Sequence, residues 1–480
     1  MKWVNNNQRF KITRNLVDRA IYYSKEKGIL TSSKIDDLKV RLNPQLDKKA
    51  IDLFLTLRYI PAPYTTYRGI KKLPVFHTLE IEPGRIKIKE EQANYQKKEF
   101  SYKQITNELR KALFEHVSGE VKDEEKVALF LSGGIDSSSI LAILSRLNVK
   151  VHTYTLGFND KDPDLLASRR LARHFSTKHR EIVLRDFPKE IFEEVILKMD
   201  EPVADPTFLP TKVLVNSLDE DLNKVFIGEG GDEVFGGYPE FRYIELAKFV
   251  RHLPRFLQIF AYLFEEKEKK KRIGNFLLDY YNYSKAFLSL KSVFTLDEKE
   301  QLYSKEFKKG LDVEKGEIFS FNSQLRFSQN IINFYLKSQL PARLISKYPQ
   351  NSKYRFCFPM LYNKIVPLMI KAPIKYKFDY FWGKDKKILR EVMKDLLPSF
   401  VLNRKKRSFT VPIDQWMKGS LKKEIEKTLN KEDVKDSGRF QWDFVSSIIY
   451  SRDKSFYWRN KLWSLFVLEK WLAMHYKGNR

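Results

Sequence analysis

The chain has 480 residues, enough for about two to four domains, and its 42% apolar and 31% charged residues exclude disorder of the whole chain. A single cysteine, Cys357, excludes an internal disulfide, a multi-thiolate metal site and a Cys-X-X-Cys redox pair, and indicates a reducing, cytoplasmic location. The net charge of +27 would suit nucleic acid, an anionic membrane or an acidic partner, but no apolar run is long enough to span a bilayer.

The first predicted unit, residues 1–97, is small and mixes strands with helix. Its β-rich runs and one helical stretch alternate with turn signals, at residues 20–23, 28–31, 47–57 (the helix) and 78–81. The first 100 residues hold 21 basic and 11 acidic side chains, so part of the excess charge lies here. We therefore expect an α+β domain with a basic surface.

A different pattern begins near residue 102 and defines a second domain, residues 98–480. It starts with a helix to about residue 118, a strand at 127–131, a helix at 137–147 and strands at 151–158 and 224–227. Strand, helix and strand in this order predict parallel βαβ winding. Beyond the last of these strands the sequence is mainly helical. The predicted fold is therefore α/β, with a doubly wound parallel sheet and a largely helical C-terminal part.

The strongest functional motif is Ser-Gly-Gly-Ile-Asp-Ser-Ser at residues 132–138, between a buried strand and a helix. Glycines let backbone N–H groups approach an anion, serine hydroxyls add donors, and the helix N-terminus adds partial positive charge. These features predict a phosphate or pyrophosphate site in which Asp136 can hold Mg²⁺. The alternative is an ordinary glycine-rich turn. The motif lacks the Gly-Lys-Ser/Thr ending of a Walker loop and the third glycine of a dinucleotide fingerprint.

A second motif, Gly-Glu-Gly-Gly-Asp-Glu-Val-Phe-Gly-Gly-Tyr, occupies residues 228–238 directly after a predicted strand. Its three carboxylates, at Glu229, Asp232 and Glu233, would repel one another unless a cation lies among them. Asp232 is therefore the candidate for a second metal ligand, and Glu229 for a base or a charge stabiliser. Taken alone, the segment could also be a glycine-rich surface turn.

Together the two motifs resemble the synthetase domain of glutamine-dependent asparagine synthetases, whose fold is of the pyrophosphate-loop ATPase (adenine nucleotide alpha hydrolase-like) type. The resemblance covers about residues 11–420. It is also carried by Asp-Glu-Pro-Val-Ala-Asp-Pro-Thr at 200–207, by Lys-Ile-Leu-Arg-Glu-Val-Met at 387–393, and by Arg-Lys-Lys-Arg-Ser-Phe-Thr-Val-Pro at 404–412. The resemblance implies ATP and Mg²⁺ as cofactors and an acyl-adenylate intermediate that an amine or ammonia attacks.

The resemblance also implies roles for individual residues. The nucleotide would be bordered by Leu131, Leu156, Ile227 and Gly228, and its phosphates cradled by Ser132, Gly133, Gly134, Asp136, Ser137 and Ser138. Asp136 and Asp232 would hold Mg²⁺. Glu229 and Lys406 would flank the reacting acyl phosphate, where a fixed ammonium can neutralise developing charge. Without the family pattern, Lys406 is one of several cations in a basic run.

The chain departs from the family's glutaminase pattern. Relatives that hydrolyse glutamine carry a nucleophilic cysteine after the initiator methionine, whereas this sequence has Lys2 there. Residues 13–23, 30–35 and 59–73 resemble only the closing third of the glutaminase domain, so residues 1–97 are expected to be a truncated remnant. We therefore expect no glutaminase activity, with nitrogen arriving as ammonia, as a substrate's amine or from a separate glutaminase subunit.

A second departure lies in the acceptor region, residues 347–359. Relatives carry an Asp and a Glu there, in Lys-Val-Asp-Arg and Glu-X-Arg-X-Pro patterns, and this chain carries neither acid. Ile227 also replaces a common serine. Aspartate is the first candidate substrate, and the alternative is a tailoring amide ligase or peptide cyclase acting on another carboxylate. A basic, non-catalytic protein that binds nucleic acid or a subunit is a third reading, which the retained carboxylates and Lys406 disfavour.

Overall fold

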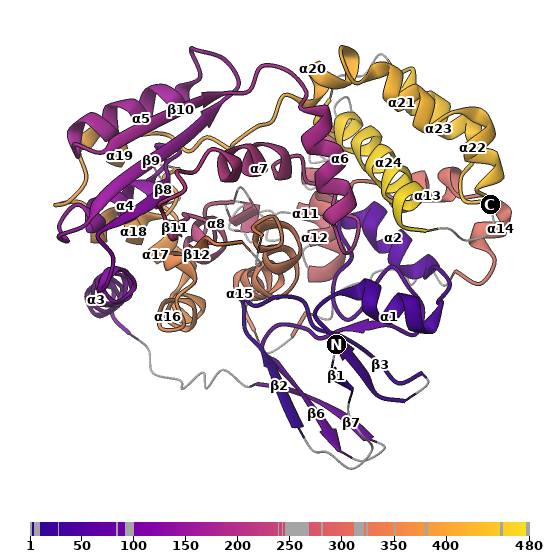
Figure 1. Cartoon of the computed structure of the whole chain (residues 1–480), viewed down its shortest axis with the longest axis horizontal. Coiled ribbons are helices and arrows are strands. Elements are labelled where there is room, and N and C mark those ends of the chain that lie inside the picture. Colours follow the sequence, from indigo (N-terminus) through magenta and orange to yellow (C-terminus); the bar gives the residue numbers. More distant parts are fainter. Residues whose placement is uncertain are drawn as a thin grey trace.

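The structure is a computed structural model. It describes residues 2–3, 10–26, 28–82, 85–91, 100–238, 240–241, 243–244, 268–279, 282–311, 321–322, 325–349, 352–379, 383–451 and 455–476. The strands of the N-terminal unit lie at the bottom of Figure 1, the parallel sheet at the upper left, and the last helices of the chain, in gold and yellow, at the upper right. No helix among these residues is long and apolar enough to cross a bilayer.

The N-terminal unit contains two antiparallel sheets and two helices, as the α+β prediction requires. One sheet has the order β1 (Lys2–Trp3), β4 (Leu30–Ser32), β3 (Tyr22–Ser24), β5 (Lys71–Lys72), and the other β2 (Phe10–Arg14), β6 (His77–Glu82), β7 (Arg85–Glu90). The helices are α1 (Ile35–Leu42) and α2 (Lys48–Leu57). The Asp47 side chain accepts hydrogen bonds from the backbone N–H groups of Lys49 and Ala50, which fixes the start of α2 near the predicted position.

A five-stranded parallel sheet forms the centre of the second part. Its order is β10 (Lys178–Val183), β9 (Lys150–Gly157), β8 (Lys126–Phe130), β11 (Lys224–Phe226), β12 (Arg355–Cys357). The helices between the first four strands are α4 (Ile135–Leu144), α5 (Pro163–His174), α6 (Lys189–Lys198) and α7 (Phe208–Asn216), and α3 (Tyr102–Val121) precedes β8. The predicted α/β fold with a parallel sheet is confirmed.

The strand order reverses between β8 and β11. From β8 the chain winds outward to β9 and β10, and then returns past β8 to form β11 on its other side. Right-handed crossovers in opposite directions place helices on opposite faces, which is the doubly wound arrangement. In such sheets, ligands bind at the carboxyl ends of the strands where the order reverses. The loops at residues 131–134 and 227–230 both leave the sheet at this point.

The C-terminal part is mainly helical, as predicted. Its elements are α8 (Gly231–Phe235), α11 (Glu268–Leu278), α12 (Tyr283–Lys291), α13 (Leu296–Leu302), α14 (Lys305–Lys308), α15 (Phe327–Phe334), the π-helix η2 (Tyr335–Ile345), the 3₁₀-helix η3 (Pro359–Leu361), α16 (Ile365–Lys371), α17 (Ile374–Lys377), α18 (Lys387–Val392), α19 (Ser399–Leu402), α20 (Ile413–Lys418), α21 (Lys422–Thr428), α22 (Lys431–Asp436), α23 (Trp442–Ile449) and α24 (Phe456–His475). The edge strand β12 was not predicted, because three residues in a polar stretch give no alternating pattern.

The N-terminal unit packs directly on the C-terminal helices. One apolar core includes Phe54 of α2, Ile196 of α6 and Trp471 of α24. A buried ion pair reinforces this contact: Lys299 of α13 donates to the Asp52 carboxylate of α2 at 2.6 Å. The proposed boundary near residue 97 therefore separates two parts of the chain that share a core.

We predict that replacing Asp52 with alanine lowers the free energy of unfolding by about 3–5 kcal/mol, because Lys299 would remain buried without its partner. Asp395→Ala is the matched control. Asp395 pairs with Arg110 at 2.7 Å but is 53% exposed, so its loss is expected to cost at most about 1 kcal/mol. Urea unfolding of both variants measures the difference. Equal losses would contradict a structural role for the buried pair.

Candidate active site

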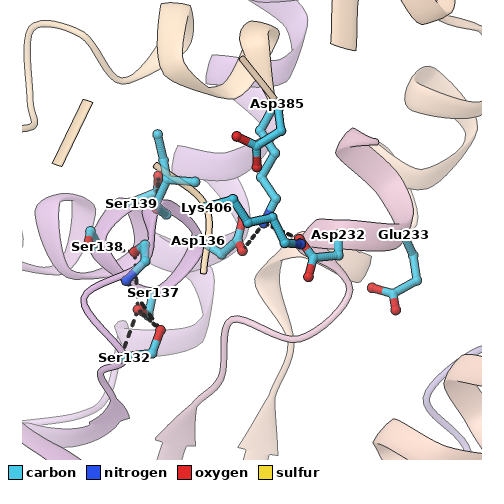
Figure 2. Close-up of polar contacts among 12 residues, drawn as sticks. Ser132, Asp136, Ser137, Ser138, Ser139, Asp232, Glu233, Asp385 and Lys406 are labelled. Atoms are coloured by element: carbon cyan, nitrogen blue, oxygen red, sulfur yellow. Dashed lines mark hydrogen bonds and ion pairs between the residues drawn. The ribbon is translucent and has the colours of Figure 1, made fainter. Parts of the chain in front are cut away.

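The first motif forms a loop held in shape by its own serines. Ser132 follows β8, and Gly134 is the N-cap of α4. The backbone N–H of Gly134 donates to Ser132 Oγ at 3.3 Å, and the backbone N–H of Ser132 donates to Ser137 Oγ at 3.2 Å (Figure 2). The loop therefore presents hydroxyls and the free N–H groups of a helix start together, an arrangement that suits an anion.

A cavity of about 540 Å³ lies where this loop meets the second motif. Among the residues singled out from the sequence, the cavity is lined by Leu131, Ser132, Gly134, Asp136, Ser137, Leu156, Ile227, Gly228, Glu229, Asp232 and Lys406. Segments nearly 300 residues apart thus meet in one space. Their meeting follows from the neighbouring positions of β8 and β11.

Two of the predicted residues, Gly133 and Ser138, are not among the cavity's lining residues. Ser138 is fully buried, and its hydroxyl donates to the carbonyl of Gly134 at 2.7 Å. A Cβ on Gly133 would lie 2.6 Å from the Cβ of Ala167 in α5. Both residues support the shape of the loop. Ser138 closes the first turn of α4, and Gly133 lets the loop approach α5.

The two predicted metal ligands lie on either side of a lysine that the sequence analysis did not identify. Lys386 contacts the Asp136 carboxylate and lies 2.6 Å from Asp232 Oδ1, and its side chain is 5% exposed. Lys406 contacts Asp232 as well (Figure 2). A signal for Lys386 was present in the sequence, because it directly precedes the family-like segment at residues 387–393.

The charged groups of this cluster shift one another's pKa values. Burial opposes ionisation of Asp232, but Lys386 and Lys406 hold the pKa of its carboxyl well below the usual range. Burial raises the pKa of Asp136, and Lys386 opposes that rise. The two carboxylates in turn hold the pKa of Lys386 above its ordinary value against the effect of burial. The site is therefore an alternating array of negative and positive groups.

Glycines in the second motif make room for these carboxylates. A Cβ on Gly231 would lie 2.4 Å from Asp136 Oδ1, and a Cβ on Gly237 would lie 2.1 Å from Asp232 Oδ1. Both distances are shorter than any tolerable contact, so a side chain at either position would displace a carboxylate. The carboxylates that pack against Gly231 and Gly237 thus explain why these two positions of the motif are glycine.

The donor set fits a divalent cation that also binds phosphate. Asp136 Oδ1 is buried and has no hydrogen-bond partner, and Asp232 Oδ1 has only its two ammonium neighbours. Mg²⁺ is commonly held by one or two carboxylates, with phosphate oxygens and water completing the octahedron. The described residues contain no group of three His, Cys, Asp or Glu side chains that could hold a metal without such help.

Glu229 lies beside residues of the acceptor region. Its carboxylate is 2.5 Å from the ammonium of Lys347 and accepts a hydrogen bond from the Tyr348 hydroxyl at 3.3 Å. The other end of that region lies elsewhere: Arg355 is 68% exposed on β12 and pairs with Glu120 of α3. Lys347 and Tyr348 thus line the cavity, although the sequence analysis noted this stretch only for the acids it lacks.

Three comparisons with known proteins place these features in context. The family model described as asparagine synthase matches residues 108–473. A Methanocaldococcus jannaschii protein named "Putative asparagine synthetase (glutamine-hydrolyzing) 2" is 30% identical over 268 residues, which are 54% of this chain and 50% of that protein. The glutamine-hydrolysing asparagine synthetase 1 of Bacillus subtilis is 23% identical over 477 residues, which are 96% of this chain and 73% of that protein.

The match therefore spans about half the length of the M. jannaschii relative. Among solved structures, the NMN synthetase of Francisella tularensis aligns at 17% identity with a TM-score of 0.21, covering 29% of this chain and 60% of that chain.

We predict that Lys386→Met lowers the free energy of unfolding at pH 7.5 by about 3 kcal/mol or more, because it leaves two facing carboxylates without the ammonium between them. Adding Asp136→Asn to this variant is expected to restore part of the loss, since one of the two charges is then gone. Lys405→Met is the control, because Lys405 is exposed. Urea unfolding tests this, and a double variant no more stable than Lys386→Met would contradict it.

Proposed function

The chain belongs to the asparagine synthase family, and on that premise we propose that it is an ATP-dependent amide-forming ligase. The carboxylate of a substrate attacks the α-phosphorus of ATP, which yields an acyl adenylate and releases pyrophosphate. An amine or ammonia then attacks the acyl carbon, and AMP leaves with the bonding electron pair. The observation that carries the proposal is the junction of both motif loops in one cavity at the reversal of strand order.

In this proposal the first loop and its surroundings hold the nucleotide. Leu131, Leu156, Ile227 and Gly228 border the adenosine moiety, and the phosphates bind the hydroxyls and N–H groups of Ser132, Gly134 and Ser137 at the start of α4. Gly133 and Ser138 act through the shape of the loop. The N–H groups of Ser132 and Gly134 donate to Ser137 Oγ and Ser132 Oγ, so binding of the phosphates would exchange these two bonds for bonds to phosphate oxygens.

Asp136 and Asp232 are the proposed Mg²⁺ ligands. The ion would neutralise charge on the phosphates as pyrophosphate leaves. Lys386 and Lys406 lie beside the same carboxylates, so they add fixed positive charge close to the phosphates. Such charge stabilises a transition state in which the bridging oxygen becomes negative.

Glu229 and Lys406 are the proposed catalytic residues. Lys406 is suited to balance negative charge on the acyl phosphate, because its ammonium is fixed between Asp232 and the ring of Tyr238, 5.2 Å away. Glu229 serves as the base that takes the proton from the attacking amine, or stabilises the resulting positive charge. Its place beside Lys347 and Tyr348 keeps it oriented toward the acceptor region.

The carboxylate substrate is proposed by comparison with the relatives. Those named as asparagine synthetases make aspartate the first candidate. A tailoring amide ligase or peptide cyclase is the second candidate. The observation that favours it is that the acceptor region presents the ammonium of Lys347 and the phenol of Tyr348 to the cavity and lacks the two acids that relatives carry there. We assign the enzyme to the cytoplasm, where ATP is available and the single free thiol stays reduced.

The test of the proposed function is carboxylate-dependent exchange of labelled pyrophosphate into ATP, screened over a panel of acids that includes aspartate. We expect exchange in the native protein and none in Asp136→Asn or Asp232→Asn, since each removes a charge that faces the phosphates. Both variants should unfold cooperatively. Exchange at native rates in either variant would contradict its assignment as a metal ligand.

The same assay separates Lys406 from its neighbour Lys405. Lys406→Ala is expected to lose about a hundredfold or more in exchange rate, because a positioned charge in such a site is worth several kcal/mol. Lys405 is exposed and contacts neither aspartate, so Lys405→Ala should lose less than about threefold. Equal losses would mean that the run at residues 404–407 acts as a diffuse basic surface.

The nitrogen source is proposed to be ammonia, a substrate's amine or a separate glutaminase subunit. The only thiol, Cys357, is buried in β12, and burial raises its pKa to about 12, so it is protonated at neutral pH and unsuited to attack an amide.

We therefore predict that the purified chain releases no glutamate from glutamine, with or without ATP. Glutamate release that persists in Cys357→Ser would contradict the proposal for the N-terminal unit. Release that disappears in Cys357→Ser would make Cys357 the nucleophile, against the prediction.

A further inference from the structure

Another part of the same cavity is crowded with cations that the proposed reaction does not use. Arg58 comes from the end of α2, Arg343 from η2 and Arg459 from α24, so three distant parts of the chain contribute. Lys347 links this cluster to the proposed catalytic Glu229, because it pairs with Glu229 and lies 3.5 Å from the Thr207 hydroxyl. The cluster therefore adjoins the place where the carboxylate substrate would react.

Arg343 and Arg459 each have an acidic neighbour. Arg343 pairs with Asp205 at 2.7 Å, and Arg459 lies 3.8 Å from Asp414. Arg58 differs, because the bond that holds its guanidinium is a 2.8 Å donation to the Asn460 amide oxygen, and no carboxylate of a described residue lies within ion-pair distance of it. Arg343 Nε is also buried without a hydrogen-bond partner. Charge and donors thus remain available to a ligand.

The backbone of Arg58 indicates that this guanidinium is held here at a cost. Its φ of 71° lies in the left-handed region, which favours glycine. The turn is fixed on both sides: the Arg58 N–H donates to the carbonyl of Phe54, and the Arg58 carbonyl accepts from Ala204. This conformation ends α2 in the usual left-handed cap, and it brings the Arg58 side chain to the wall of the cavity.

The arginines also repel one another. Burial lowers the pKa of Arg58 to about 9, and the neighbouring Arg343 and Arg459 act in the same direction against Asp205. Arg58 is nevertheless charged at neutral pH. A bound anion would remove this repulsion and supply the missing acceptors.

The carboxylates here are already engaged. Asp205 accepts from Arg343 and, at 2.9 Å, from the Thr207 hydroxyl, while Glu229 is held by Lys347. Glu233 also lines the cavity, but the Tyr238 hydroxyl donates to its carboxyl and burial raises its pKa to about 7, so it is only about half ionised at neutral pH. A free α-amino group beside Arg58 and Arg343 would therefore meet more positive than negative charge.

We propose that the carboxylate substrate carries a second anionic group, a carboxylate, phosphonate, phosphate or sulfonate, which binds Arg58 and Arg343, and that it carries no free ammonium. This inference rests on the proposed ligase function. It favours an acid with two anionic groups and no ammonium over aspartate, which has two carboxylates and an ammonium, and it assigns the N-terminal unit a direct part in substrate recognition through Arg58.

Binding is tested by titration calorimetry of the full chain with a magnesium complex of a non-hydrolysable ATP analogue. Succinate, 3-phosphonopropionate and 3-sulfopropionate are the dianionic probes and distinguish the anion's chemistry; butyrate and aspartate are the comparisons. Arg58→Gly removes the guanidinium and suits the positive φ, so it should fold at least as stably as the native chain. Arg173→Gln, at an exposed arginine in the last turn of α5, is the control for lost charge.

We expect at least one dianion to bind the native chain about tenfold or more tightly than butyrate, since a charged hydrogen bond is worth that much, and more tightly than aspartate, because the aspartate ammonium would be repelled by the arginines. That preference should disappear in Arg58→Gly and remain in Arg173→Gln. Equal dianion affinity in the native chain and Arg58→Gly would overturn the inference, as would tighter binding of aspartate or butyrate, or no binding of any dianion.

Pyrophosphate exchange with the same acids separates the two claims. Exchange that is best with aspartate or butyrate would overturn the inference and leave the ligase function standing. Arg58-dependent dianion binding with no exchange for any acid would overturn the ligase function, and the anion site would remain.

Discussion

Two partly buried carboxylates, 19% and 31% exposed, with a buried lysine between them set the geometry of this site. Asp136 and Asp232 follow neighbouring parallel strands, so the topology of the sheet forces them together. Glycines leave them room, and Lys386 supplies the charge without which they would repel each other. Lys386 lies about 150 residues beyond Asp232 in the sequence, so the C-terminal part must fold over the sheet edge before the carboxylates are balanced.

The need to balance these carboxylates with cations from elsewhere in the chain explains why the cavity is assembled from distant segments. The sheet supplies the loops that suit phosphate, the C-terminal part supplies Lys386 and Lys406, and the N-terminal unit reaches the cavity through Arg58. The shared apolar core and the buried Asp52–Lys299 pair hold that unit in place. The N-terminal unit thus forms part of the wall of a cavity that is proposed for a ligase reaction.

Much of the fold follows from local sequence patterns. The buried strand before residue 132, the glycine and serine loop and the helix after it are local features, so their order predicted a parallel sheet and an anion site at its edge. Arg58 and Arg343 could not be selected in this way, and the signal for Lys386 was only its position directly before the family-like segment at residues 387–393. They are three of 88 basic residues, and their importance depends on which distant carboxylates lie beside them. Local sequence also does not decide which loop residues face the cavity: Gly133 and Ser138 were expected to help cradle the phosphates, and among the described residues they do not line the cavity.

The central claim is that a substrate carboxylate is activated by transfer of an adenylyl group. It is tested most directly by supplying MgATP, ammonia and a carboxylate labelled with oxygen-18, chosen from the acids that support exchange, and analysing the products by mass spectrometry. The account predicts that AMP carries one oxygen-18 atom, because the carboxylate oxygen that attacked the α-phosphorus leaves with it. Label in inorganic phosphate together with ADP, or amide formation without transfer of label to AMP, would contradict it.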